Sequence, residues 1–306
     1  MILYKEKERK IKKVSLFLFM ESIIQQFKEQ GEKRRFETYT TTLNSFKRFR
    51  QQKDIQLKAM DKDEICAYEA FLKKRGLCMN TISFYMRNLR AVYNRAVEAG
   101  LIEQKYPFRL VYTGQEKTKK RALVLSDIKR IKSLDLSHNP SLEYARDLFM
   151  LSFYLRGISF VDLVYLEKKN LKYGILTYRR KKTGQQLTIK WEPCMTQILE
   201  RYHLPDSPYL LPVIHTKKDS RREYLNASHL VNKKLKEIGH YLHIPIPLTM
   251  YVARHSWATI AKEKNIPLAI ISEGLGHDSE RTTQIYLNSL DTTKVDRANS
   301  IILHSL

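Results

Sequence analysis

Apolar side chains recur three or four positions apart through the first hundred residues, which is the spacing of one face of an α-helix. Such stretches lie at 19–27, at 39–49, after Asp61 and at 80–98. Acidic residues follow Asp61 in the first turn of the third stretch, where the helix dipole stabilises negative charge. The pattern predicts a compact four-helix domain over residues 14–104.

Helical periodicity lapses in the next segment, which contains Pro107, Gly114 and a run of basic residues. We interpret residues 105–121 as a basic linker. A linker that follows DNA and an ordinary solvated connector both fit this segment.

A second domain is expected over residues 122–306, and most of it is typical of helices. The exception is two stretches of alternating polar and apolar residues, 174–179 and 186–190, on either side of Lys182-Thr183-Gly184. Alternation about a short glycine-containing turn predicts a β-hairpin. The expected fold class is therefore mainly α with a small β-sheet, in two lobes.

The chain carries 55 Lys and Arg against 32 Asp and Glu, a formal net charge of +23. This excess suits a polyanion, because each phosphate that the protein neutralises releases counterions. An anionic membrane is the competing partner, but no apolar run is long enough to cross a bilayer. Double-stranded DNA is the expected partner, and no membrane is.

The cysteines Cys66, Cys78 and Cys194 show neither metal-ligand spacing nor the pattern of a disulfide framework. We expect free thiols in a reducing cytoplasm and no metal site. Basic residues expected to contact DNA lie on the fourth helix, in the linker and on the hairpin, although a solvated face is the alternative for any one of them. They are Arg87, Arg90, Arg95, Lys119, Lys120, Arg179, Arg180 and Lys181.

Near the C-terminus, His277 follows a Gly-x-Gly turn, and Tyr286 lies nine positions further along the chain. Arg254 lies upstream in Ala253-Arg254-His255. An arginine offers a planar fork of donors to two phosphate oxygens, and a histidine donates a hydrogen bond or a proton. Together with a phenol, these groups suit nucleophilic attack on a phosphodiester.

These segments resemble the tyrosine recombinase (phage integrase) family, whose four catalytic stations fall in the same order here. The stations are Leu155-Arg156-Gly157-Ile158-Ser159-Phe160-Val161-Asp162, Lys182 in the hairpin, Tyr251-Val252-Ala253-Arg254, and His277 with Tyr286. The resemblance implies an N-terminal SAM-like core-binding domain and a C-terminal α+β catalytic domain.

Two positions depart from the usual family pattern. Ser159 occupies the slot of the first arginine, and Arg156 lies three residues earlier, so it is the expected substitute. Tyr251 stands where the family usually has histidine, and a phenol with a pKa of about 10 is a poor general base at neutral pH. The Arg-Gly-x-Ser-Phe variant resembles recombinases and invertases of the Bacteroidetes type.

The resemblance implies that Tyr286 attacks a DNA phosphate and forms a 3′-phosphotyrosyl bond without metal, nucleotide or other cofactor. Arg156 and Arg254 would neutralise the charge on the phosphate, with His277 and Tyr251 completing the clamp. Lys182 would protonate the leaving oxygen. Two paired DNA sites imply a homotetramer in the bacterial cytoplasm, associated with the nucleoid, with an accessory directionality factor as a further partner.

The leading hypothesis is a site-specific DNA recombinase that integrates, excises or inverts DNA segments. A type IB topoisomerase-like relaxer would use the same chemistry on a single duplex. A catalytically impaired DNA-binding regulator is the second alternative, favoured by Ser159 and Tyr251 but opposed by the retained Lys182, Arg254, His277 and Tyr286.

Overall fold

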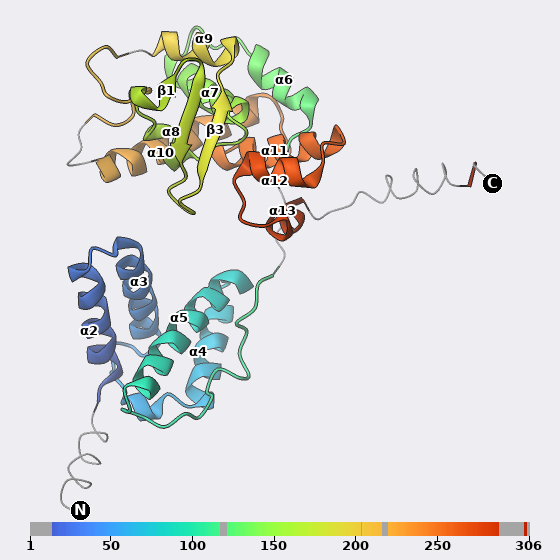
Figure 1. Cartoon of the computed structure of the whole chain (residues 1–306). Helices are drawn as coiled ribbons and strands as arrows, with labels where there is room; N and C mark the ends of the chain where they lie inside the picture. Colours follow the sequence, from blue (N-terminus) through green and yellow to red (C-terminus); the bar gives the residue numbers. More distant parts are fainter. Residues whose placement is uncertain (1–13, 117–120, 203, 216–219, 288–302, 305–306) are drawn as a thin grey trace, which may run out of the picture. The chain divides into compact units, whose positions relative to one another are not determined.

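The computed structural model describes residues 14–116, 121–202, 204–215, 220–287 and 303–304, apart from the side chains of Ile285 and Tyr286. The chain divides into two compact units, Met1–Thr118 and Lys119–Leu306. Their described residues are mainly helical, with one three-stranded sheet in the second unit (Figure 1). The expected fold class is confirmed.

Helices build the described part of the first unit. They are α2 (Leu16–Glu29), α3 (Lys33–Phe49), α4 (Lys62–Lys74) and α5 (Met79–Glu98), with the short 3-10 helix η1 (Leu57–Ala59) before α4. Ser15 begins α2 by accepting a hydrogen bond from the Leu18 N–H. Asp61 begins α4 in the same way, by accepting from two N–H groups of the first turn. The helices predicted from apolar spacing are therefore present.

The core of the first unit is rich in aromatic rings. Phe46 and Tyr68 pack edge to face with their centroids 5.0 Å apart, and the Tyr68 hydroxyl donates to Ser45 Oγ at 2.7 Å. Phe108 and Val111 are buried in the same core, although they fall within the predicted linker. The first part of that segment therefore packs on the helices, while the domain boundaries inferred from the sequence stay predictions.

The second unit is built around α7, which packs against α9, α10 and α11. This helix is buried on most sides, since every residue from Ala145 to Ser152 is buried, including the charged pair Arg146 and Asp147. The helices in the described part of the unit are α6 (Leu125–Ser133), α7 (Pro140–Tyr154), α8 (Phe160–Val164), α9 (Pro193–Arg201), α10 (Ser220–Tyr241), α11 (Met250–Glu263), α12 (Leu268–Leu275) and α13 (Glu280–Leu287), with the 3-10 helix η2 (Lys168–Asn170).

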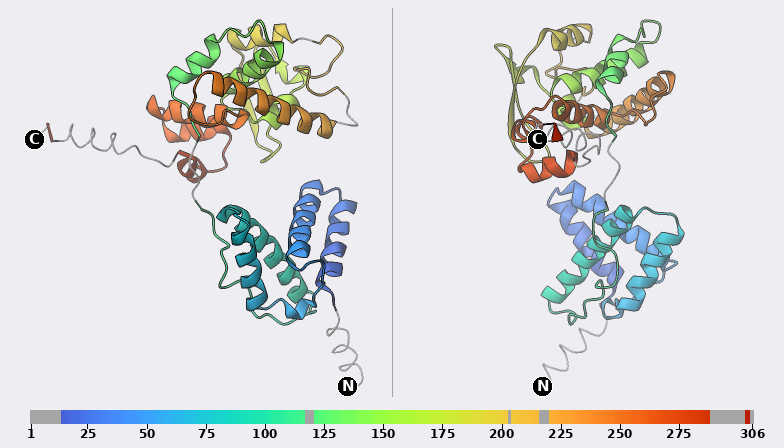
Figure 2. Two further views of the ribbon diagram at one scale, coloured as in Figure 1. Left: turned by 180° about the vertical axis from the view of Figure 1, so that it is seen from behind. Right: turned by 90° about the vertical axis from the view of Figure 1, so that its right-hand side faces the viewer.

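An antiparallel sheet lies on one side of these helices (Figures 1 and 2). It contains β1 (Leu171–Lys172), β2 (Ile175–Arg179) and β3 (Gln186–Lys190), in that order. Strands β2 and β3 pair along their whole length, with Ile175 opposite Lys190 at one end and Arg179 opposite Gln186 at the other. This pairing confirms the predicted hairpin. Alternate residues of β2 and β3 are buried, so the hairpin presents one face to the core.

Helices α11, α12 and α13 form a small cluster of their own. Ala258 of α11, Ile271 and Leu275 of α12, and Leu287 of α13 pack together as buried apolar residues. Lys262 Nζ of α11 also donates to the Leu287 carbonyl oxygen at 3.0 Å. These contacts attach α13, which carries Tyr286, to α11, which carries Arg254.

Candidate active site

Arg254 lies at the centre of the site and is only 5% exposed. Its Nη1 donates to the Gly157 carbonyl oxygen at 2.9 Å, and its Nη2 donates to the Leu275 carbonyl oxygen at 2.6 Å. Nη2 also lies 3.2 Å from Nε2 of His277. A buried guanidinium held by several acceptors is fixed in position, as a preorganised phosphate donor must be.

The turn after α7 brings Arg156 to the same place. Arg156 and Gly157 both have left-handed backbone conformations, with φ of 57° and 71°. A Cβ at Gly157 would lie 2.5 Å from Cα of Arg254, so the turn lies directly against α11 and only glycine fits. Arg156 is half-buried, and its Cδ lies 3.7 Å from where a Cβ of Gly274 would be.

The buried phenol of Tyr178 shows how closely the cations gather. Burial raises the pKa of this phenol, and the charge of Asp162 adds to the rise. Arg254, Arg180 and Arg156 all oppose that rise through their positive charges. Three arginines from different segments therefore lie within electrostatic range of one residue of β2.

Ser159, in the slot of the first family arginine, has a structural role in this chain. It begins α8 as the N-cap, and its hydroxyl donates to Oδ2 of Asp162 at 2.6 Å. Asp162 is 4% exposed, and its Oδ1 accepts from the Lys181 N–H at 2.8 Å. This carboxylate therefore ties the turn after α7 to the basic end of the hairpin.

The hairpin divides its basic residues between two faces. Arg179 is exposed and donates to the Gly184 carbonyl oxygen at 3.2 Å. Arg180 is 8% exposed, and its Nη1 donates to the carbonyl oxygen of Gly276, directly before His277. Lys182 is exposed on the turn, and its charge acts on His277. The DNA contact expected of Arg180 stays a prediction, and the structure places its side chain inside the site.

The role of Arg180 had a sequence signal. Leu176 and Tyr178 are the buried positions of β2, so the alternation of the strand continues inward to Arg180 and outward to Arg179. Two-residue periodicity in the sequence is therefore enough to distinguish the buried Arg180 from the exposed Arg179.

His277 links α11 to α13. It follows Gly276, which ends α12 in the left-handed conformation, and its N–H donates to the Ser272 carbonyl oxygen at 3.0 Å. Its Nδ1 lies 2.7 Å from Oγ1 of Thr283, a fully buried residue of α13. Thr283 was not identified from the sequence, although it precedes Tyr286 by one helical turn.

The pKa of His277 is lowered to about 4. Burial is the largest cause, followed by the positive charges of Arg254, Arg180 and Lys182, while Asp278 opposes them. The imidazole is therefore neutral at neutral pH in the DNA-free protein.

Tyr286 belongs to α13, and its side chain lies outside the described residues. Tyr251 is described and is 57% exposed, with its ring edge-on to that of His255 at 4.5 Å. A cavity of about 440 Å³ has Tyr251, Arg254 and Ser159 among its lining residues. Tyr251 thus lies at the rim of the site.

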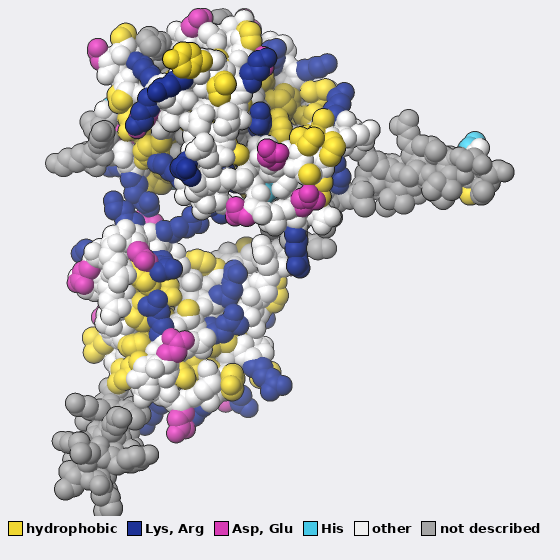
Figure 3. All heavy atoms as spheres, viewed as in Figure 1, with side chains coloured by type: hydrophobic (Ala, Val, Ile, Leu, Met, Phe, Trp, Pro, Cys, Tyr) yellow, Lys and Arg dark blue, Asp and Glu magenta, His cyan; other side chains and the backbone are white. Residues whose placement is uncertain are grey.

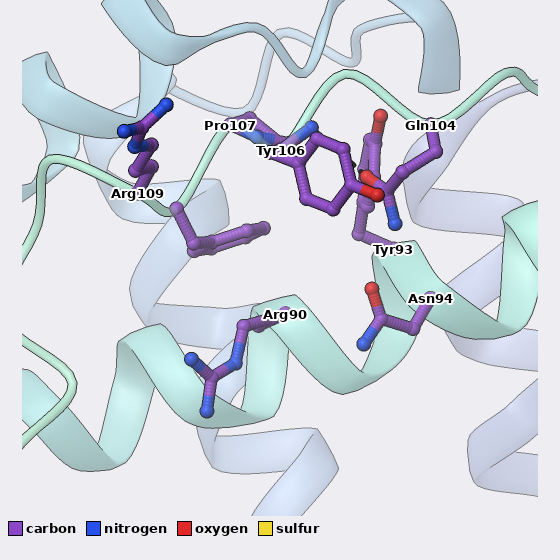
Figure 4. A pocket seen from close by; sticks show the side chains of 8 residues that line it. Arg90, Tyr93, Asn94, Gln104, Tyr106, Pro107 and Arg109 are labelled. Carbon is purple, nitrogen blue, oxygen red and sulfur yellow. Dashed lines mark hydrogen bonds between the residues drawn. The ribbon is translucent and has the colours of Figure 1, made fainter.

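The arginines expected on α5 differ in their surroundings. Arg95 stacks over the rings of Phe27 and Tyr39, at 5.1 and 5.9 Å from their centroids. Arg87 and Arg90 are exposed. Arg90 lines a cavity of about 580 Å³ beneath the ring of Tyr106 (Figure 4).

Other basic side chains are spread over the surface of both units (Figure 3). Lys119 and Lys120 lie outside the described residues. Within the described part of the chain, no group of three His, Cys, Asp or Glu is placed to hold a metal ion, and no helix is long and apolar enough to span a membrane.

Comparison with protein families assigns the two units. The model of the phage integrase SAM-like domain matches residues 15–112, and that of the phage integrase family matches residues 126–293, more than half of the chain. The chain belongs to the phage integrase family. The tyrosine recombinases of this family are site-specific DNA recombinases, and the function predicted from the sequence is confirmed at this level.

Individual relatives agree with this assignment. Tyrosine recombinase XerA of Pyrococcus furiosus is 30% identical over 222 residues, which cover 71% of this chain and 72% of that protein. Tyrosine recombinase XerD of Listeria innocua is 25% identical over 238 residues, covering 74% and 77%. The integrase fold is also that of a lambda integrase tetramer bound to a Holliday junction, with a TM-score of 0.71 and 15% identity over 92% of this chain and 81% of that one.

Proposed function

We propose that Tyr286 of this phage integrase family member attacks a DNA phosphate and forms a 3′-phosphotyrosyl bond, releasing a 5′-hydroxyl. The observation that carries this proposal is the pair of contacts made by His277, with Arg254 at 3.2 Å and with Thr283 at 2.7 Å. Thr283 and Tyr286 lie one turn apart on α13, so they share a helix face. The helix of the nucleophile is thereby joined to the buried guanidinium.

Arg254 and Arg156 donate hydrogen bonds to the non-bridging phosphate oxygens in this mechanism. Charge develops on those oxygens during attack, and donors that are already in place stabilise it most. Arg156 replaces the usual first arginine of the family, because the residue in that arginine's position is Ser159, whose hydroxyl donates to Asp162. The buried Arg180 is a positioning residue, because it holds the peptide bond before His277.

Lys182 protonates the departing 5′ oxygen. A 5′-alkoxide is a poor leaving group, so a proton donor on the hairpin turn lowers the barrier. Asp162 supports this role by accepting from the Lys181 N–H and thereby holding the hairpin at the residue before Lys182.

The phosphotyrosyl bond retains the energy of the phosphodiester, and a 5′-hydroxyl of a partner duplex reverses the step. Exchange between two duplexes requires four active sites, so we propose a homotetramer on paired DNA sites. The lambda integrase tetramer on a Holliday junction supports this assembly by likeness of fold. Integration, excision or inversion in the bacterial cytoplasm, with an accessory directionality factor, completes the proposal.

Mapping the covalent adduct tests the reaction. The enzyme is incubated with a duplex that carries a nick a few nucleotides beyond the cleavage site. Cleavage then releases a short fragment that bears the 5′-hydroxyl, and the adduct persists because this fragment diffuses away. We expect mass spectrometry to find the 3′-phosphate on the peptide that contains Tyr286. A second labelled duplex then distinguishes exchange from relaxation, since a topoisomerase-like enzyme rejoins only its own ends.

A further inference from the structure

The contacts of His277 determine which of its ring nitrogens carries the proton. An arginine N–H only donates, so Nε2 of His277, 3.2 Å from Nη2 of Arg254, must accept through its lone pair. In a neutral imidazole the proton is then on Nδ1. Nδ1–H donates to Oγ1 of Thr283 at 2.7 Å.

The charges around the ring keep it neutral. Arg254 faces it from α11, Arg180 and Lys182 face it from the hairpin, and Asp278 is its neighbour in the chain. Burial and the three cations outweigh the single carboxylate and lower the pKa of His277 to about 4. The neutral form therefore has one defined donor, Nδ1–H, and one defined acceptor, Nε2.

Thr283 is suited to hold this arrangement. It is fully buried, and its helix is fixed at the other end by the hydrogen bond from Lys262 to Leu287. A base whose second nitrogen is held by a fixed partner keeps one tautomer and one ring orientation. Docking of α13 therefore sets both the tautomer of His277 and the position of the turn that carries Tyr286.

We propose that Thr283 is a positioning residue that holds His277 as the Nδ1–H tautomer, so that Nε2 is the general base for the Tyr286 hydroxyl. This rests on the proposed role of Tyr286 as nucleophile. It also accounts for Tyr251, since a phenol at the usual histidine position leaves attack without its ordinary base. In this proposal, Nε2 of His277 accepts the phenol proton, whereas the sequence led us to expect that His277 donates a hydrogen bond to the phosphate.

The step is balanced in protons and bonds. The scissile phosphate accepts the Nη2–H of Arg254 that otherwise points to Nε2 of His277, while the bond from Nη2 to the Leu275 carbonyl oxygen stays. This exposes the Nε2 lone pair, and the negative charge of the phosphate raises the pKa of His277 from its low value in the DNA-free protein. As the bond from Tyr286 Oη to phosphorus forms, the phenol proton passes to Nε2, and the bond from phosphorus to the 5′ oxygen breaks. Lys182 gives a proton to that oxygen, and rejoining reverses each transfer.

Nuclear magnetic resonance of the DNA-free full chain tests the tautomer without any reaction. With ¹⁵N-labelled histidine, we expect the His277 ring to show Nδ1 protonated and Nε2 unprotonated at pH 7. Thr283→Val keeps the branched shape but removes the hydroxyl, and we expect it to increase the Nε2–H form. Thr283→Ser should restore the original pattern, and the neighbouring Thr282→Val is the matched control that should not change it.

Adduct formation on the nicked duplex tests the consequence. Loss of such a supporting partner lowers activity by about 10- to 100-fold, so Thr283→Val should slow the adduct by that factor while Thr283→Ser and Thr282→Val react nearly as fast as wild type. A melting curve for each variant reports folding separately. A Thr283→Val protein with the wild-type tautomer would overturn the positioning role, whatever its rate.

His277→Gln separates a base from a phosphate donor. Glutamine donates a hydrogen bond to phosphate but takes up no proton at neutral pH. We expect this variant to react about 100-fold or more slowly and to lack the fall in rate at low pH that we expect of wild type. A wild-type rate and pH profile in His277→Gln would overturn the base role. Adduct formation by Tyr286→Phe would instead refute the proposed nucleophile and leave the tautomer measurement intact.

Discussion

Arg254 and Gly157 hold each other in place across the site: Nη1 of Arg254 donates to the Gly157 carbonyl oxygen at 2.9 Å, and a Cβ on Gly157 would lie 2.5 Å from Cα of Arg254. The turn after α7 is thus built directly against the middle of α11. This contact brings Arg156, the residue before the glycine, to Arg254, which we propose binds the phosphate.

Gly157→Ala should destabilise the second unit strongly. The left-handed backbone costs a side chain about 1 to 2 kcal/mol, and the overlap with α11 adds a packing cost, so we expect a loss of about 3 kcal/mol or more. Gly174→Ala is the matched control, because its φ of 70° is nearly the same and nothing lies within 4 Å of its added Cβ. Urea unfolding of both variants measures the difference, and equal losses would show that the contact with Arg254 is unimportant.

Arg156→Ala and Ser159→Ala should have different effects. Arg156→Ala removes a proposed phosphate donor, and loss of one such donor costs about 100- to 1,000-fold in rate. Ser159→Ala removes only the N-cap of α8 and the bond to Asp162, which costs about 1 kcal/mol of stability. Adduct formation at saturating DNA measures the first effect and thermal melting the second. Equal or reversed effects on the rate would mean that another residue replaces the first arginine.

The adjacent arginines of the hairpin offer a second comparison. Arg180→Ala removes a buried side chain that holds the Gly276 carbonyl oxygen, so we expect cleavage to fall steeply. Arg179→Ala alters an exposed residue, and we expect it only to weaken DNA binding. The slope of the logarithm of the binding constant against the logarithm of the salt concentration should decrease by about the amount that one phosphate contact contributes. Rates at saturating DNA and binding at several salt concentrations test both. A cleavage defect confined to Arg179→Ala would reverse the assignment.

His277 should make stability depend on pH. Its pKa is about 4 in the folded protein, against 6.5 for an unperturbed histidine, so between these values the unfolded chain binds a proton that the folded protein does not. Stability is therefore lost as the pH falls from about 6.5 toward 4. Relative to His277→Gln, the wild type should lose free energy of unfolding across this range. Parallel curves for the two proteins would contradict the lowered pKa.

Much of the fold was predictable because local patterns and tertiary structure agree. The apolar stripes of the first unit face its core, Asp61 begins α4, and the alternating segments about Lys182 form the hairpin. The packing of Phe108 on the first unit was not predictable, because that segment has no periodicity and its burial depends on contacts with distant residues.

The site was predictable where motifs place residues in sequence, and less so where burial decides their role. The order Arg254, His277, Tyr286 pointed to the reaction, but Thr283 becomes significant only when its hydroxyl is seen at Nδ1 of His277. The DNA contact expected of Arg95 stays a prediction, and its guanidinium stacks on aromatic rings of neighbouring helices, which the sequence did not indicate. One-dimensional spacing does not show which face of α5 meets another helix.

Tyr286 is the proposed nucleophile, the residue that becomes joined to DNA. Tyr286→Phe removes only the hydroxyl, and Tyr251→Phe makes the same change at the rim of the site. Covalent adduct on a nicked duplex, measured beside DNA binding for both variants, is the most direct test. We predict that Tyr286→Phe binds DNA like the wild type and forms no adduct, while Tyr251→Phe still forms it. A persistent adduct in Tyr286→Phe would show that another residue attacks the DNA.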